Sequence, residues 1–259
     1  MPKFAANLTM LFNEVEFPER FEAAANAGFH AVEYLFPYAY PKEQLAEQLE
    51  RFGLEQVLHN LPAGDWAKGE RGIAALPDRV GEFQDGVGKA IEYATALGCK
   101  QLNCLAGIHQ NGLAEEKVRE TLLANLRFAA SKLKAAGMRL LVEAINTRDV
   151  PGFCIYKTQH TLDLIEASGS DNIFVQYDVY HMQRMEGELA ATMQKHLPRI
   201  AHIQIADNPG RNEPGTGEIN FPFLFTLLDR AGYAGWIGCE YKPRATTGES
   251  LGWYAKWRG

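Results

Sequence analysis

The sequence predicts an α/β protein that closes into a (β/α)₈ barrel. Short apolar runs alternate eight times with longer segments of helical periodicity. The 259 residues contain no stretch with the composition of a linker. An open, doubly wound sheet rarely needs so many strand–helix repeats, whereas a closed barrel is built from them. We therefore expect one domain that covers residues 1–259.

Each expected strand is a short apolar run, and each expected helix is the longer periodic segment that follows it. The strands are expected at residues 4–11, 31–36, 55–60, 101–107, 139–146, 173–181, 200–207 and 235–241. The helices are expected at 17–29, 41–53, 81–98, 115–137, 161–169, 187–198 and 221–233, and residues 249–259 are a candidate for the last helix. Most of these helical segments end in or near glycine, which is a common signal for a helix C-terminus.

Two segments do not fit the simple repeat. Residues 61–79 follow the third expected strand and are too long for a plain connection, so they are either an active-site lid or a surface loop without a role. The aromatic segment 35–41, LFPYAYP, is expected to be exposed, as a lid or as the interface of a homo-oligomer.

Composition narrows the class of protein. The net charge of −6 disfavours nucleic acid as a partner, because binding to phosphates is driven mainly by lysine and arginine. No apolar run is long enough to span a membrane, and no secretory signal is visible at the start, so we expect a cytoplasmic protein without a membrane partner. The four cysteines form no Cys-x-x-Cys pair, and we expect them to be reduced core residues.

Four polar residues occur late in the last four expected strands, where the apolar pattern calls for core residues. They are Glu143, Asp178, Gln204 and Glu240. Strand alternation directs each of them toward the barrel axis, and chemistry in such barrels occurs where the carboxyl ends of the strands converge. Taken singly, each is explained equally well as a hydrogen-bonded core group or as the partner of an arginine. Four on consecutive strands favour a shared site.

Three carboxylates brought together away from water repel one another, and a bound cation resolves this most simply. Oxygen donors from Glu143, Asp178, Gln204 and Glu240 suit Mg²⁺ or Mn²⁺, and the absence of thiolates argues against structural zinc. His202 precedes Gln204 by two residues and is expected one layer deeper, as a hydrogen-bond donor to a metal ligand or as a core histidine, although an exchange of roles with Gln204 stays open.

Several segments make the chain resemble a known family. They are FAANLTMLF, VEYLFPY, LVEAIN, the Asp-x-x-His of YDVYH, HIQIAD, GTGEINFPFLF and GYAGWIGCEYKPR. Over nearly its whole length the chain resembles the hydroxypyruvate isomerase family, in its 2-oxo-tetronate isomerase branch. This family belongs to the xylose-isomerase-like TIM barrels, which also include the ketose 3-epimerases.

The resemblance implies roles for particular residues. Glu143 and Glu240 match glutamates that bind the metal and also exchange protons with the substrate, while Asp178 and Gln204 match the other ligands. His181 matches a histidine that contacts the substrate. The epimerases carry a His-x-His on the seventh strand and use its second histidine, so Gln204 departs from that pattern.

The expected function is an isomerase that moves a carbonyl between adjacent carbons of a small hydroxy-oxo acid, 2-oxo-tetronate to 3-oxo-tetronate, through a metal-stabilised enediolate. The alternatives are hydroxypyruvate to tartronate semialdehyde and, less favoured, a ketose 3-epimerase or an inosose-type dehydratase. A metal-dependent nuclease is disfavoured because the seven histidines are scattered, and a non-catalytic sugar-binding module stays open. An acidic substrate calls for a cation near the site, and Arg211 and Lys242 are the candidates, with Arg244 as an alternative.

Overall fold

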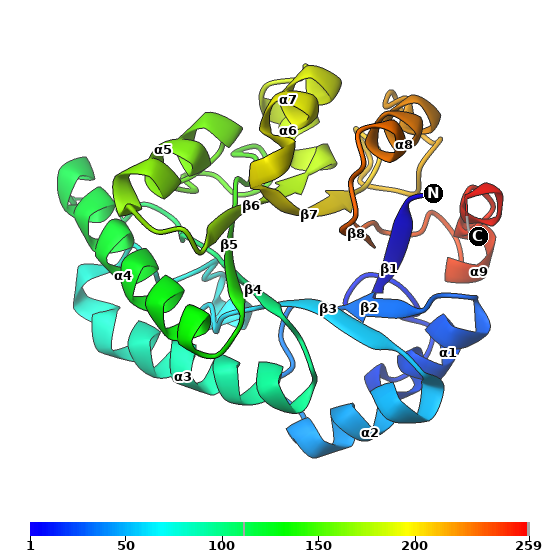
Figure 1. Ribbon diagram of the computed structural model, residues 1–259, viewed down its shortest axis with the longest axis horizontal. Coiled ribbons are helices and arrows are strands. Elements are labelled where there is room, and N and C mark those ends of the chain that lie inside the picture. Colours follow the sequence, from blue (N-terminus) through cyan, green and yellow to red (C-terminus); the bar gives the residue numbers. More distant parts are fainter. Residues whose placement is uncertain (111, 258–259) are drawn as a thin grey trace.

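Eight parallel strands close a barrel in the order of the sequence within residues 1–110 and 112–257, the part of the chain that the computed structural model describes (Figure 1). They are β1 (Lys3–Asn7), β2 (Ala31–Glu33), β3 (Glu55–Asn60), β4 (Gln101–Cys104), β5 (Arg139–Glu143), β6 (Ile173–Asp178), β7 (Ile200–Ile205) and β8 (Trp236–Cys239). β1 pairs with both β2 and β8, which closes the sheet. The predicted (β/α)₈ barrel is confirmed.

Helices surround the strands on the outside of the barrel (Figure 1). They are α1 (Arg20–Asn26), α2 (Lys42–Phe52), α3 (Val80–Ala96), α4 (Glu115–Ala135), α5 (Thr158–Ser168), α6 (Val179–Met185), α7 (Leu189–His196), α8 (Phe221–Arg230) and the short α9 (Thr247–Ser250). Short 3₁₀ turns lie at Phe17–Glu19, Trp66–Lys68, Pro77–Arg79, Leu197–Arg199 and Tyr254–Lys256. None of the helices in the described part of the chain has the length and apolar character that crossing a membrane requires.

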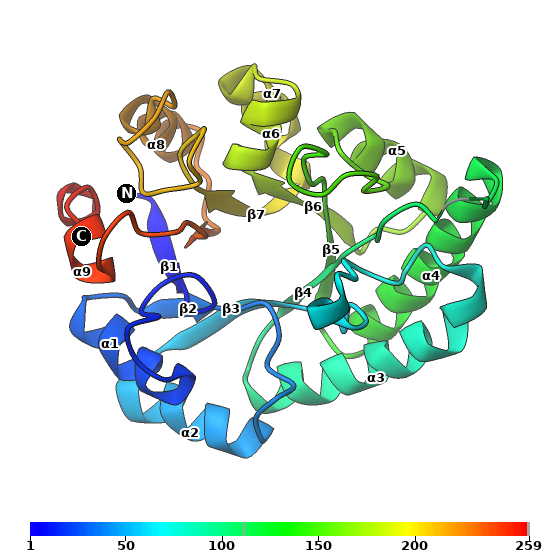
Figure 2. The ribbon, with the colours of Figure 1, turned by 180° about the vertical axis from the view of Figure 1, so that it is seen from behind.

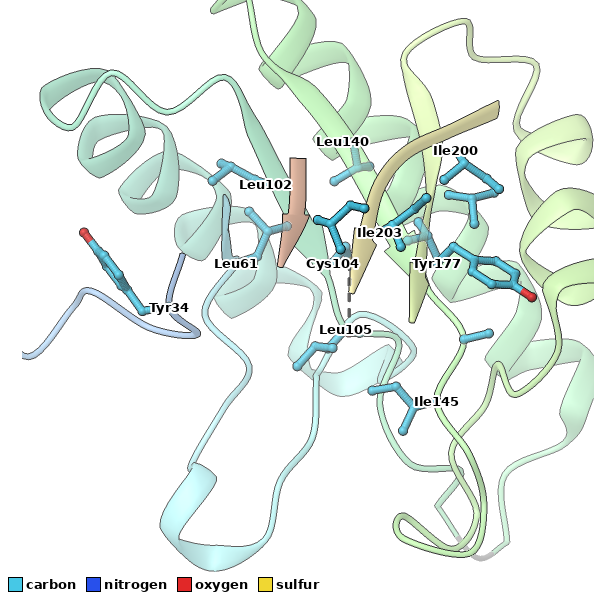
Figure 3. Close-up of a cluster of buried hydrophobic side chains, with 14 of the residues drawn as sticks. Tyr34, Leu61, Leu102, Cys104, Leu105, Leu140, Ile145, Tyr177, Ile200 and Ile203 are labelled. Carbon is cyan, nitrogen blue, oxygen red and sulfur yellow. Dashed lines mark hydrogen bonds between the residues drawn. The ribbon is translucent and has the colours of Figure 1, made fainter. Parts of the chain in front are cut away.

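The apolar core has an outer layer and a small inner one. Buried side chains from the outward-facing strand positions pack against the helices, and Figure 3 shows Leu102, Leu140 and Ile203 in this outer layer. Leu141, next to Leu140, points the other way and packs with Ala5 and other small or aliphatic residues inside the barrel. This alternation directs Glu143, two residues after Leu141, toward the barrel axis.

The sixth strand ends earlier than the sequence predicts. β6 stops at Asp178 and α6 begins at Val179, so the expected strand 173–181 is wrong in its last three residues. The Asp178 side chain caps α6, because its Oδ1 accepts the backbone N–H of Tyr180 at 2.8 Å and of His181 at 3.3 Å. A carboxylate in this position satisfies donors that a helix start otherwise leaves unpaired.

The end of the chain also differs from the expected helix 249–259. α9 begins earlier, at Thr247, because Thr246 and Glu249 form a capping box. It ends at Ser250, and a separate 3₁₀ turn follows at Tyr254–Lys256. Residues 258–259 lie outside the described residues.

The aromatic segment 35–41 is not the exposed surface that the sequence predicts. Phe36, Tyr38 and Tyr40 are half-buried. The Tyr38 hydroxyl donates to the carbonyl of Asn60 at 2.6 Å, and the ring of Phe36 packs edge-on against Trp66 with centroids 5.0 Å apart. The segment is therefore packed against the loop that follows β3.

The loop of residues 61–79 has a fixed inner part and an exposed tip. Residues 73–76 are buried, and the backbone of Ala75 donates to Ala106 at 3.0 Å. Gly72 lies against the backbone of Leu105 with a φ of 117°, where a Cβ has no room. The exposed residues of this loop are 65–69 at the tip and Asp78 near its end. Figure 2 shows this loop and the loops after β5 and β7 on the same face of the barrel.

Candidate active site

Three of the expected residues meet at the carboxyl ends of β5 and β6. Glu143 is the last residue of β5, Asp178 is the last residue of β6, and His181 lies in the first turn of α6. One donor atom from each of the three lies within 4.8 Å of the others, and all three side chains are buried. Glu143 also lines one small cavity together with Gln204 and Glu240.

Glu143 has one engaged oxygen and one open oxygen. Asn103, on β4, donates its Nδ2 to Glu143 Oε2 at 3.0 Å. Glu143 Oε1 lies 3.9 Å from His181 Nε2. Burial raises the pKa of Glu143 well above its ordinary value, and the negative charges of Glu240 and Asp178 raise it further. This carboxyl group therefore binds protons or cations more readily than an exposed glutamate.

Asp178 also has one engaged oxygen. Oδ1 caps α6, whereas the buried Oδ2 accepts no hydrogen bond from any described residue. Oδ2 lies 3.5 Å from His181 Nε2 and 3.6 Å from Arg211 Nη2. An unpaired buried carboxylate oxygen is costly unless a cation or a donor comes to it.

Glu240 follows β8 directly and is paired with Arg211. The Arg211 Nη2 donates to Glu240 Oε2 at 2.5 Å. Burial raises the pKa of Glu240 to about 8, although Arg211 opposes this rise. Burial disfavours the Arg211 cation, but the carboxylates of Glu240, Asp178 and Glu143 outweigh it and raise the pKa of Arg211. Arg211 therefore remains charged in the site.

The loop that carries Arg211 is organised around the buried Asp207, just after β7. The Asp207 carboxylate accepts four backbone N–H groups, from Asn208 (3.0 Å), Gly215 (2.8 Å), Gly217 (2.9 Å) and Ile219 (3.1 Å). Arg211 itself has a left-handed backbone with a φ of 55°, and its carbonyl accepts the backbone N–H of Lys242 at 2.8 Å. These contacts hold the guanidinium over the carboxylates.

Gln204 belongs to a buried polar network that crosses the barrel. Its Nε2 donates to Glu33 Oε1 at 2.8 Å, and its Oε1 accepts from Gln176 Nε2 at 2.6 Å. His202 Nε2 lies 2.6 Å from Glu33 Oε2, so His202 is a core histidine, as expected. A Cβ at Gly238 on β8 would collide with the Glu33 carboxylate, which would have to leave its hydrogen bonds to make room.

His181 is fixed by Asn146, in the loop after β5. Asn146 Nδ2 lies 2.6 Å from His181 Nδ1, and the backbone N–H of Asn146 also points at this nitrogen, at 3.4 Å. Burial lowers the pKa of His181 to about 4, against the attraction of Asp178. The imidazole is therefore neutral near pH 7.

The structure separates the basic residues that the sequence nominated for the substrate. Arg211 contacts Glu240 and Asp178, whereas Lys242 and Arg244 are exposed. Lys242 contributes its backbone, which supports Arg211 and accepts from Asn212 at 2.8 Å. No described contact brings the Lys242 side chain to the carboxylates.

Buried polar residues of the first four strands were not expected from the sequence. Besides Gln56 and His59 of β3, they are Asn7, Glu33, Asn60 and Asn103. Each of these last four stands at or near the end of its strand, the same position that pointed to Glu143 and Asp178 in the later strands. Searching all eight strands for late polar residues, instead of the last four, would have found them.

The residues present fit a divalent cation. Carboxylates from Glu143, Asp178 and Glu240 are crowded within a buried site, and burial raises the pKa values of the two glutamates, with a further rise from the neighbouring negative charges that Arg211 only partly offsets. The unpaired Asp178 Oδ2 and the Glu143 Oε1 face the same region. Such oxygen donors are those that Mg²⁺ and Mn²⁺ prefer.

Comparison with known proteins shows the family and the fold of the chain. A family model described as a xylose isomerase-like TIM barrel matches residues 21–257. The hydroxypyruvate isomerase of Escherichia coli (strain K12) is 53% identical over 258 residues, and the 2-oxo-tetronate isomerase of Cupriavidus necator is 46% identical over 259 residues; both alignments cover 100% of each chain. The crystal structure of a protein named AP endonuclease, family 2, from Brucella melitensis is 46% identical, covers 100% of both chains and superposes with a TM-score of 0.97. The chain therefore belongs to the hydroxypyruvate isomerase and 2-oxo-tetronate isomerase family of xylose isomerase-like TIM barrels.

Proposed function

We propose that this protein is an isomerase that moves a carbonyl between C2 and C3 of a small hydroxy-oxo acid, with 2-oxo-tetronate as substrate and 3-oxo-tetronate as product. The observation that carries the proposal is the pair of buried glutamates, Glu143 and Glu240, which line one cavity and have raised pKa values. Carboxyl groups tuned toward neutral pH can remove and return protons. The names of the two relatives supply the class of substrate.

The reaction needs a proton to leave C3 and a proton to arrive at C2, while the hydroxyl proton passes from the oxygen on C3 to that on C2. No atom is gained or lost, so no co-reactant is required. Glu143 and Glu240 together serve as base and acid, and Oε1 of Glu143 is the open oxygen. A positioned base of this kind contributes about 10² to 10⁴ in rate.

A divalent cation, Mg²⁺ or Mn²⁺, would be held by Glu143, Asp178, Gln204 and Glu240. Bound there, it supplies Lewis-acid stabilisation of the negative charge that develops on the enediolate, on the order of several kcal/mol. Glu33 accepts from the Gln204 amide nitrogen, so the carbonyl oxygen is the end of this side chain that would face a cation; this oxygen also accepts from Gln176 and would offer its second lone pair.

Two cationic or donor groups are available for the substrate's own oxygens. The Arg211 guanidinium is placed to bind a carboxylate in a forked geometry once it shares its hydrogen bonds with the substrate. His181, between Glu143 and Asp178, is placed to contact a substrate oxygen.

Hydroxypyruvate is the second candidate substrate, because the relative that is 53% identical carries that name. The same shift in this three-carbon acid gives tartronate semialdehyde. The two candidates are separated by incubating EDTA-treated protein with each acid, adding back Mg²⁺ or Mn²⁺, and following products by proton NMR. We expect an isomer without loss of water, and a larger kcat/KM for the four-carbon acid.

Variants complete the test. Glu143→Gln should lower kcat by at least about 10²-fold, the range typical of a lost acid–base group. Glu218→Gln is the matched control, because Glu218 is exposed and bonds only Gln183 and Asn208 among the described residues. Activity that survives complete metal removal would refute the site. A dehydrated product or an inverted C3 would indicate a dehydratase or an epimerase instead, and full function in Glu143→Gln would indicate a binding module.

The endonuclease name of the Brucella protein raises the nuclease alternative, which the charge of this chain disfavours. The chain carries a net charge of −6. Among the described residues, His181 is the one histidine in the cluster of candidate ligands. Tight binding to duplex DNA with a steep dependence on salt would contradict the proposal.

A further inference from the structure

We propose that Asn146, held in place by Asp149, is a positioning residue that keeps the proton of His181 on Nε2, so that His181 donates a hydrogen bond to a substrate oxygen and does not ligate the metal. That the acceptor of this hydrogen bond is a substrate oxygen rests on the proposed function. The position of the proton rests only on the contacts among Asn146, Arg148, Asp149 and His181.

The orientation of the Asn146 amide is fixed by its other contacts. Its Oδ1 accepts the backbone N–H of Arg148 at 3.1 Å and of Asp149 at 2.9 Å. Its Nδ2 donates to Asp149 Oδ2 at 3.0 Å. Exchanging the two ends of the amide would replace all three hydrogen bonds with repulsive contacts. The nitrogen end therefore faces His181.

Two donors consequently point at one nitrogen of the ring. Asn146 Nδ2 lies 2.6 Å from His181 Nδ1, and the backbone N–H of Asn146 donates to the same atom at 3.4 Å. An N–H can only donate, so Nδ1 must present its lone pair. In a neutral imidazole the single proton is then on Nε2.

Nε2 is the atom that faces the carboxylates. It lies 3.5 Å from Asp178 Oδ2 and 3.9 Å from Glu143 Oε1. Distance alone makes Glu143, Asp178 and His181 a candidate set of metal ligands. A ring nitrogen that carries a proton has no lone pair for a cation, so His181 acts as a hydrogen-bond donor and not as a metal ligand. Such a donor stabilises negative charge on the oxygen of a hydroxy-oxo acid.

Asp149 makes the arrangement rigid. Besides the Asn146 amide, its carboxylate accepts from the Tyr180 hydroxyl at 2.8 Å and from Arg184 Nη1 at 2.6 Å. Tyr180 is adjacent to His181 in α6, so the loop after β5 and the first turn of α6 are tied together by the same carboxylate. The side chain that orients His181 is thereby itself oriented.

NMR can show directly which ring nitrogen of His181 carries the proton. Protein labelled with ¹⁵N-histidine is studied by NMR, and His181 is assigned from its loss in His181→Gln. We expect an unprotonated Nδ1 and a protonated Nε2 in the wild type, both without metal and with saturating Mg²⁺. Asn146→Asp places a carboxylate beside Nδ1 and should move the proton to Nδ1, with kcat reduced by about 10²-fold, as for other lost oxyanion donors.

Asn172→Ala is the matched control. Asn172 is also buried and donates two hydrogen bonds, to Ala130 and Met138, at the other end of β6. This variant should lose stability and leave the His181 signals unchanged. The inference is overturned if the wild-type proton is on Nδ1 or if Mg²⁺ removes the proton from Nε2. It is also overturned if the proton stays on Nε2 in Asn146→Asp or moves to Nδ1 in Asn172→Ala. If the expected ring pattern is seen in a protein that isomerises no hydroxy-oxo acid, the assignment of the proton stands and the proposed function fails.

Discussion

Replacing Asp207 with asparagine tests how the loop after β7 holds Arg211. Each oxygen of the Asp207 carboxylate accepts two backbone N–H groups, Oδ1 from Asn208 and Ile219 and Oδ2 from Gly215 and Gly217. Whichever oxygen becomes an NH₂ group, two of the four contacts become donor against donor. Hydrogen bonds to a charged group contribute about 1.5–3 kcal/mol each, so Asp207→Asn should destabilise the loop by about 3–6 kcal/mol.

Amide hydrogen exchange measures this change locally. A loss of about 3 kcal/mol corresponds to opening that is about 10²-fold more frequent, so one pair of the four amides should exchange at least about 10²-fold faster. Because the loop positions Arg211, kcat/KM for the hydroxy-oxo acid should fall together with the protection. Asp229→Asn is the control, since Asp229 is half exposed and pairs with the chain's amino group. Exchange rates and kcat/KM equal to those of the wild type would refute the reasoning.

Three further outcomes are expected. Asn103→Ala removes the hydrogen bond to Glu143 Oε2 and should lower kcat by about 10-fold, equivalent to about 1.4 kcal/mol. The change in KM should be smaller. Steady-state kinetics that show a change in KM alone would contradict this prediction. Mg²⁺ at about 100 times its Kd should raise the free energy of unfolding, measured by calorimetry, by about 2.7 kcal/mol. Asp178→Asn keeps an oxygen that can cap the helix, and it should abolish this rise. An equal rise in the variant would exclude Asp178 as a ligand. Burial lowers the pKa of His59 to about 3, so the unfolded chain binds a proton that the folded chain excludes between pH 6.5 and 3, and stability falls as the pH falls through this window. Urea unfolding at about pH 7.5 and pH 4.5 should show about 3 kcal/mol less acid destabilisation in His59→Phe than in the wild type, and an equal loss in both proteins would disprove this role of His59.

The barrel was predictable because its signal is repeated. Every strand is an apolar run that the helices cover, so the eightfold alternation survives errors at single boundaries. The strand ends were less predictable, since the expected strands 4–11, 31–36, 101–107, 139–146 and 173–181 run three or four residues past the ends of β1, β2, β4, β5 and β6. At β6 a single side chain decides the boundary. Asp178 ends β6 by capping α6, and a single aspartate in an apolar run reads equally well as a buried strand residue.

The candidate site was predictable only in part. Alternation and barrel geometry brought Glu143 and Asp178 together, and the cavity adds Gln204 and Glu240. Alternation puts Lys242 on the face of Glu240 just beyond the strand, but the loop there leaves its side chain exposed to solvent. The contact between Asn146 and His181 joins residues 35 positions apart through a loop, and no local pattern encodes it.

The Glu33 carboxylate fills the space that the missing Cβ of Gly238 leaves open. Glu33 also engages both His202 and Gln204 from the opposite side of the barrel. The side chains at these positions of β2, β7 and β8 therefore depend on one another for space and for hydrogen bonds. Introducing the histidine of the epimerases at position 204 therefore requires compensating changes on β2 and β8 as well as on β7. Substitutions at position 204 alone should seldom give a folded, active protein.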